Sequence, residues 1–298
     1  MRITEALTTL RPFFSFEFFP PKDDAGSKTL FETIETLTPL RPAFVSITYG
    51  AGGSTRTRTV ALAKQIQNEL GLTVVAHVTC VGASRAELRE LLDDLARSGI
   101  KNVLALRGDP PRGETAFVPA ANGFSSAAEL IAMIKRNYDF CIGAACYPET
   151  HQDAASPQAD LDYLKTKVDA GADFLITQLF FDNNDFYEFE RRARANGIGV
   201  PILPGLMPIT NFSQLQRFTK LCGASIPPKL FAELEARKDD QRAVEDFGVS
   251  FASMQAVGLL QNGAPGIHFI TLNRSPATRA VASAILAASA WRPQFERV

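Results

Sequence analysis

Short apolar runs rich in aromatic and β-branched residues alternate along this chain with longer segments whose apolar positions recur at helical spacing. The apolar runs predict eight strands, which begin near Phe13, Ala43, Thr73, Lys101, Cys141, Asp173, Val200 and Gly266. The helical segments cover about 27–38, 56–70, 84–98, 125–137, 156–170, 183–196, 210–221 and 275–288. Several of them open with a Ser, Thr or Asn that can cap a helix.

The spacing of the strands indicates one strand and one helix per unit. Successive strand starts lie 27 to 40 residues apart, except for a last interval of 66 residues, in which we expect two extra helices at 227–235 and 241–261. Eight such units most simply form an α/β fold of the (β/α)8 TIM barrel type with extra helices between strands 7 and 8. An open doubly wound sheet uses the same alternation. Because no linker rich in Gly, Pro or Ser divides the chain, we expect residues 1–298 to form a single domain.

Composition and charge narrow the class of protein. The chain is 46% hydrophobic and 21% charged, with a net charge of −1 and no basic run, so we expect a folded core and no nucleic acid partner. No stretch approaches a membrane-spanning length, the first residues lack the apolar middle of a signal peptide, and the four cysteines show no CxxC pair. We therefore expect a cytoplasmic protein without membrane contact. The three histidines lie far apart in the sequence, so we expect no metal site.

The first predicted strand carries the most unusual candidate for chemistry. In the run FFSFEFF, which begins at Phe13, alternation places Glu17 on the same face as Ser15, and aromatic residues fill most other positions. Desolvation by these aromatic residues is expected to raise the pKa of Glu17, as a general acid near neutral pH requires. The alternative is a carboxylate at a solvated rim that pairs with an arginine.

Polar residues recur where the predicted strands end. In a barrel these ends and the loops after them carry the chemistry. Seven of the eight strands have such a residue at or near the end, namely Glu17, Thr48, His77, Asp109, Tyr147, Gln178 and Arg274. The glycine-rich turn after the second strand, at 50–53, is too weak a match to name a phosphate site. The pattern indicates a binding site for a polar ligand without naming the ligand.

A set of short motifs, in order from about residue 13 to residue 286, resembles the methylenetetrahydrofolate reductase family. The motifs are SFEFFPP, TYGAGG, ALRGDPP, AACYPETH, QADLDYLKTKVDAGAD, ITQLFFD, LPGLMPITNF and TLNR. The resemblance implies a TIM barrel flavoprotein in which NADH or NADPH reduces FAD. The reduced flavin then converts 5,10-methylenetetrahydrofolate to 5-methyltetrahydrofolate, a methyl donor for methionine synthesis. It also implies a homo-oligomer, and the length of the chain predicts the catalytic barrel without a C-terminal regulatory domain.

The resemblance also implies roles for individual residues. Glu17 matches the general acid that protonates the folate, and Asp109 matches an acidic residue beside flavin and folate. Substrate contacts are implied for Gln178, Phe212 and Arg274, and a nicotinamide contact for Thr48. Cofactor contacts are implied for Thr48, Tyr49, Ala51, His77, Leu106, Arg107, Gly108, Asp109, Ala127, Tyr147, His151, Asp160 and Lys167. On charge grounds, Arg107 and Lys167 are candidates for the pyrophosphate.

Some positions depart from the family pattern. Tyr163 and Thr166 stand where an Asn and an Arg often help to hold FAD, and the stretch 112–123 is longer and more irregular than expected. The sequence does not discriminate between NADH and NADPH. Two alternatives stay open: another FAD-dependent barrel oxidoreductase, such as one like proline dehydrogenase, and a folate-binding barrel without catalytic activity.

Overall fold

The computed structural model describes residues 1–298 except 11–12, 22, 49–55, 111–112, 115 and 289–298, and it describes no side chains for 56–58. Its strands are β1 (Phe13–Phe18), β2 (Phe44–Ile47), β3 (Val74–Thr79), β4 (Asn102–Leu106), β5 (Cys141–Cys146), β6 (Phe174–Thr177), β7 (Ile202–Leu203), β8 (Gly205–Leu206) and β9 (Gly266–Ile270). Neighbouring strands pair in parallel in the order β7-β6-β5-β4-β3-β2-β1-β9-β8. Strand alternation with helices therefore produces the expected parallel sheet.

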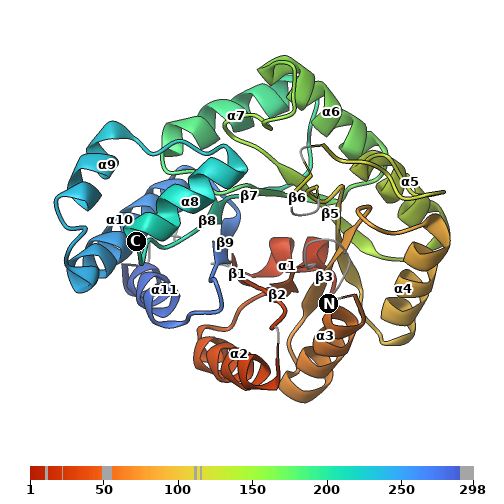
Figure 1. Cartoon of the computed structure of the whole chain (residues 1–298), viewed down its shortest axis with the longest axis horizontal. Coiled ribbons are helices and arrows are strands. Elements are labelled where there is room, and N and C mark those ends of the chain that lie inside the picture. Colours follow the sequence, from red (N-terminus) through yellow and green to blue (C-terminus); the bar gives the residue numbers. More distant parts are fainter. Residues whose placement is uncertain (11–12, 22, 49–55, 111–112, 115, 289–298) are drawn as a thin grey trace, which may run out of the picture.

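Helices follow the strands and surround them in an outer ring (Figure 1). They are α2 (Asp24–Leu37), a 3-10 turn η1 (Thr38–Leu40), α3 (Arg56–Leu70), α4 (Arg85–Arg97), α5 (Ala127–Asn137), α6 (Pro157–Asp169), α7 (Asn183–Ala195), α8 (Phe212–Cys222), α9 (Pro228–Glu235), α10 (Gln241–Gln261) and α11 (Pro276–Ala288). The two extra helices expected before the last strand are α9 and α10. Among the described residues, no helix combines the length and the apolar character needed to cross a bilayer.

The predicted seventh strand is divided into two short strands, β7 and β8. Each of them pairs with a different end of the sheet. Pro204, which has no N–H to donate to a ladder, separates β7 from β8; β7 pairs with β6, and β8 pairs with β9. The Pro204 carbonyl accepts from the His268 N–H at 3.0 Å, and the Gly205 N–H donates to Thr177 Oγ1 at 2.8 Å. One short segment thus spans the gap between β6 and β9, which closes the sheet into a barrel rather than an open doubly wound sheet.

An N-terminal helix that the sequence pattern did not predict, α1 (Ile3–Thr9), lies inside the ring of strands in Figure 1. Its buried Ile3, Ala6 and Leu7 pack with interior residues of the strands. The buried Asn102 side chain accepts from the Ile3 N–H at 2.9 Å and donates to the Met1 carbonyl at 3.1 Å. This helix fills the end of the barrel from which the strands start.

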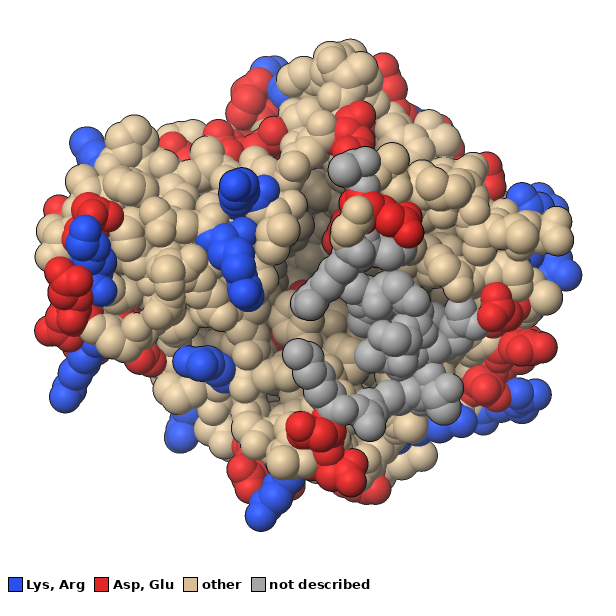
Figure 2. Space-filling model, viewed as in Figure 1, with Lys and Arg blue, Asp and Glu red and all other residues tan. Residues whose placement is uncertain are grey.

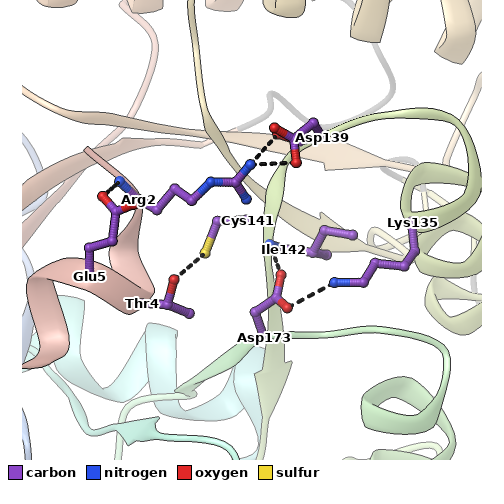
Figure 3. Close-up of polar contacts among 8 residues, drawn as sticks. All are labelled: Arg2, Thr4, Glu5, Lys135, Asp139, Cys141, Ile142 and Asp173. Carbon is purple, nitrogen blue, oxygen red and sulfur yellow. Dashed lines mark hydrogen bonds and ion pairs between the residues drawn. The ribbon is translucent and has the colours of Figure 1, made fainter.

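Further polar contacts fix this N-terminal segment and its surroundings (Figure 3). Arg2 pairs with Asp139, just before β5. One oxygen of Asp173 accepts from the Ile142 N–H at 2.8 Å and the other accepts from Lys135 at 3.0 Å. Structural contacts therefore occupy the N-terminal ends of the strands. In this type of barrel the site lies at the opposite end, where the strands finish.

Candidate active site at the barrel mouth

The mouth of the barrel comprises the C-terminal ends of the strands and the segments that follow them. Its deepest described acidic side chain is Glu17, 14% exposed, on β1. Glu17 Oε2 lies 3.4 Å from His268 Nε2 on β9 and 3.6 Å from His77 Nε2 on β3. His268 Nδ1 lies 2.8 Å from Ser15 Oγ. We call Glu17, His77, His268 and Ser15 the glutamate cluster.

Strand alternation and register bring the glutamate cluster together. On β1, Phe14, Phe16 and Phe18 face the layer between the sheet and the helices, whereas Ser15 and Glu17 face the barrel interior. The parallel register places Ser15 opposite His268. With its proton on Nε2, the His268 ring donates to Glu17 and accepts from the Ser15 hydroxyl, so every polar atom of this contact is used.

The environment of Glu17 corrects the expectation of a raised pKa. Burial does push the pKa of Glu17 upward, but the hydrogen bond from His268 and the electrostatic interactions with the His77 and His268 imidazoles push it down further, to below the ordinary value. The expectation failed because the aromatic neighbours along β1 point to the other face, and imidazoles surround the carboxylate instead. Glu17 is therefore ionised at neutral pH in this structure, and no arginine among the residues whose side chains are described pairs with it.

His77 stays uncharged beside this carboxylate. Burial lowers the pKa of His77 to about 4, against the opposing effect of the Glu17 charge. Its Nε2 is buried and has no hydrogen-bond partner among the described residues. A buried polar atom without a hydrogen-bond partner is costly, so His77 Nε2 is available to a polar atom of a ligand.

A second group of polar residues lies at the ends of β4 and β5 and on α6. Arg107 pairs with Asp153 at 2.8 Å, and the Asp153 N–H donates to His151 Nδ1 at 3.0 Å. The His151 N–H donates to Asp160 at 3.0 Å, and the His151 ring meets Tyr147 edge to face, with centroids 4.6 Å apart. These five residues, four of them predicted to contact the cofactor, form one connected group.

Lys167 belongs to the same region but is buried. Its Nζ donates to the Ala145 carbonyl at 2.6 Å and lies near the rings of Tyr147 and Tyr163. Burial lowers the pKa of Lys167, against the effects of Cys146 and Asp160. The Lys167 ammonium group is therefore used in a buried hydrogen bond to β5. Of the two pyrophosphate candidates, Arg107 is the one whose side chain is partly exposed.

Gly108 is required at its position by both conformation and space. Its φ is +87°, and a Cβ there would stand 2.6 Å from Val81 Cγ1 and 3.2 Å from Thr79 Cβ. The Val81 N–H donates to the Arg107 carbonyl at 3.0 Å, which holds this turn against the end of β3. The glycine therefore lets the backbone after β4 pack directly against the end of β3 and the residues that follow it.

The predicted substrate contacts lie around the mouth at different depths. Asp109 and Arg274 are exposed, and neither side chain has a partner in the described part of the chain. Gln178 is partly buried, and its Oε1 accepts from the Leu179 N–H at 2.9 Å. Phe212, at the start of α8, packs edge to face with Phe231 of α9, with centroids 5.3 Å apart. Phe212 is 7% exposed, so little of its ring is open to a ligand in this structure.

The remaining predicted cofactor contacts have mixed positions. Thr48 is buried just after β2, Leu106 ends β4, and Ala127 is buried as the first residue of α5. Tyr49 and Ala51 lie outside the described residues. The face of the molecule seen in Figure 1 is hollowed near its centre, with acidic and basic side chains around the hollow (Figure 2).

Comparison with known proteins identifies the family. The family model described as methylenetetrahydrofolate reductase matches residues 2–285. The chain belongs to the methylenetetrahydrofolate reductase family. It is 40% identical to the 5,10-methylenetetrahydrofolate reductase of Pectobacterium carotovorum over 90% of this chain and 88% of that protein. It is 42% identical to methylenetetrahydrofolate reductase (NADH) 1 of Arabidopsis thaliana, but it spans only 46% of that relative's length.

Solved structures agree on the fold of this methylenetetrahydrofolate reductase family member. An uncharacterised protein from Clostridium thermocellum, described as binding two copies of 5-methyl-5,6,7,8-tetrahydrofolic acid, covers 95% of the chain with a TM-score of 0.63 at 18% identity. Dihydropteroate synthase from Xanthomonas albilineans aligns with a TM-score of 0.52 at 14% identity. At these identities the likeness concerns the barrel fold alone.

Sequence reasoning did not assign a role to several residues of the site. Ser15 and His268 were visible as polar residues in apolar strands, but only the β1–β9 register shows that Ser15 bonds His268, which in turn contacts Glu17. Asp153, the partner of Arg107, lies in a loop and carries no signal in the pattern. Asn273 lies within the TLNR motif, but nothing in the sequence pattern indicates that its side chain bonds Phe19.

Proposed function

We propose that this chain reduces 5,10-methylenetetrahydrofolate to 5-methyltetrahydrofolate with FAD as cofactor and NADH or NADPH as reductant. The observation that carries the proposal is the buried Glu17, 3.4 Å from His268 at the mouth, in a member of this family. A buried carboxylate within reach of two imidazoles is the kind of group that can gain and give a proton during a reaction.

The residues at the ends of β3 to β5 fit a flavin nucleotide. The buried Thr79 Oγ1 and His77 Nε2 have no hydrogen-bond partners among the described residues, and Gly108 lets the turn after β4 pack closely against Val81 and Thr79. Arg107 offers a guanidinium to a pyrophosphate, because its present partner, Asp153, is 63% exposed. Such a surface ion pair is worth about 1 kcal/mol or less, so an anionic ligand can displace it. FAD bound there would take hydride from the nicotinamide and supply it to the folate.

Glu17 supplies the proton that the folate half of the reaction needs. In this proposal, its carboxyl group protonates a folate nitrogen, the five-membered ring opens to a cationic iminium, and that carbon becomes able to accept hydride. Burial already pushes the pKa of Glu17 upward, and replacement of the remaining water by the folate strengthens that effect. The carboxylate thereby gains its proton as the mouth fills.

The other residues at the mouth orient the ligands. Asp109 places a negative charge where it stabilises the cationic folate, and Arg274 offers a fork of donors to a folate carboxylate. Gln178 can exchange its contact with the Leu179 N–H for a substrate atom, and Phe212 offers a ring for stacking. The homo-oligomer stays a prediction, which light scattering on the purified protein checks.

An anaerobic spectroscopic experiment tests the proposed function. The purified protein is loaded with FAD, bleached with NADH or with NADPH, and then mixed with 5,10-methylenetetrahydrofolate. We expect the oxidised flavin band to return on addition of folate, with 5-methyltetrahydrofolate as the product. Bleaching without a response to folate would favour another flavin barrel oxidoreductase, and a protein that binds folate but not FAD would favour a non-catalytic barrel.

A further inference from the structure

The turn at residues 271–274, which follows β9, holds the end of β1 by hydrogen bonds. Thr271 Oγ1 donates to the Glu17 carbonyl at 2.6 Å, and the Thr271 N–H donates to the same oxygen at 3.3 Å. The main chain of Glu17 is therefore fixed from the side of β9. His268, on the same strand, fixes the Glu17 side chain.

Asn273 holds the chain two residues further on, at Phe19, directly after β1 ends. Its Nδ2 donates to the Phe19 carbonyl at 2.9 Å, and its Oδ1 accepts from the Phe19 N–H at 2.8 Å. A side-chain amide can satisfy both backbone groups of one residue in this way, whereas a carboxylate cannot, because it has no donor. The Asn273 N–H donates to Thr271 Oγ1 at 3.1 Å, which links the two holding residues.

The turn is strained as well as bonded. Leu272 has φ +52° and Asn273 has φ +58°, so two successive residues with side chains lie in the left-handed region. This conformation costs about 1–2 kcal/mol for an ordinary residue such as leucine. Strain of this kind persists where the surrounding bonds determine the conformation, and it concentrates at functional sites. Here the hydrogen bonds from the turn to Glu17 and Phe19 hold Leu272 and Asn273 in this conformation.

We propose that Asn273 is a positioning residue that fixes the main chain at Phe19, two residues after Glu17, and so sets the position of Glu17 relative to Arg274. Arg274 directly follows Asn273, and its N–H donates to the Thr271 carbonyl at 3.0 Å. The 271–274 turn thus joins the predicted acid to the predicted folate-binding arginine, which come from opposite ends of the chain. This inference rests on the proposed function, because it assigns both residues to the folate half of the reaction.

The test separates the two half-reactions in variants of Asn273. Asn273→Gly removes the amide and tolerates positive φ, and Asn273→Asp keeps the acceptor but loses the donor. Asn262→Asp is the control, since Asn262 Nδ2 also donates twice, to Tyr187 and Gly258, but lies in the turn after α10, before β9 begins, whereas Asn273 follows the end of β9. FAD content, the rate of anaerobic bleaching by the reductant and the rate of reoxidation by 5,10-methylenetetrahydrofolate are measured for each protein.

We expect both Asn273 variants to hold FAD and to bleach at the parental rate, while reoxidation by folate slows by about 10- to 100-fold, as a displaced catalytic group typically does. Asn262→Asp should match the parent in both steps. Reoxidation of Asn273→Gly at the parental rate, or an equal loss in both half-reactions, would overturn the positioning role alone. A parent protein that folate does not reoxidise would overturn the proposed function, and this inference with it.

Discussion

His77 Nε2 lies 3.6 Å from Glu17 Oε2 and has no hydrogen-bond partner among the described residues. Burial lowers the pKa of His77 from 6.5 to about 4. The folded protein therefore holds His77 neutral over a range of pH in which the unfolded chain would protonate it. The relationship makes stability depend on pH in a predictable direction.

We expect the free energy of unfolding to fall as the pH falls from 6.5 to about 4, because in that range the unfolded state binds a proton that folded His77 does not. Between pH 7 and pH 5 the loss from this residue amounts to about 2 kcal/mol. The lowered pKa of Glu17 adds a loss only below its unfolded value of 4.5. Urea unfolding of the parent and of His77→Gln at both pH values measures the difference.

His77→Gln should lose less stability than the parent between pH 7 and pH 5, whatever the two stabilities are at pH 7. If the variant and the parent lose the same amount, His77 is not held neutral by burial. The comparison between two pH values removes any change in packing caused by the substitution itself.

Gly108→Ala tests the close approach after β4. The added methyl must adopt φ +87° and would stand 2.6 Å from Val81 Cγ1. We expect a loss of about 1–3 kcal/mol from overpacking beyond the conformational cost, together with weaker FAD binding. Gly263→Ala is the matched control, because Gly263 has φ +93° and open space around its Cβ position.

Chemical unfolding and FAD titration of both variants measure these effects. Gly263→Ala should show the conformational cost alone and bind FAD as the parent does. Equal losses of stability in the two variants, with unchanged FAD binding in both, would show that the Val81 contact does not shape the site.

Thr177→Val tests the closure of the barrel at β8. The valine has the same shape but leaves the Gly205 N–H without its 2.8 Å acceptor. An unsatisfied buried donor costs about 1–3 kcal/mol. Thr79→Val is the control, because Thr79 Oγ1 is buried without a hydrogen-bond partner among the described residues, so its replacement should be neutral or stabilising. Thermal unfolding of both variants measures the difference. A Thr177→Val protein as stable as Thr79→Val would show that the bond to the Gly205 N–H does not stabilise the closure.

The sequence predicted the order of strands and helices because periodicity is a local property of the chain. It missed the break at Pro204 because Val200 to Leu206 is one apolar run, and only closure of the sheet divides its partners between β6 and β9. It missed α1 because seven residues are too few to show a period.

The sequence was enough to predict which residues of β1 face the site, but not the direction in which the pKa of Glu17 is shifted. Alternation placed Glu17 and Ser15 on one face of β1, and the structure confirms this. The direction of the Glu17 pKa depends instead on His77 and His268, which lie 60 and 251 residues away in the chain. Contacts of that separation arise from strand register, which a single sequence does not display.

The general acid role of Glu17 is tested most directly by stopped-flow reoxidation of reduced enzyme with 5,10-methylenetetrahydrofolate, in the parent, Glu17→Gln and the exposed control Glu35→Gln. Removal of the acid should slow reoxidation of Glu17→Gln by about 100-fold or more, while bleaching by NADH or NADPH stays at the parental rate. Glu35→Gln should match the parent in both steps. A Glu17→Gln enzyme that folate reoxidises at the parental rate would contradict the role assigned to the glutamate cluster.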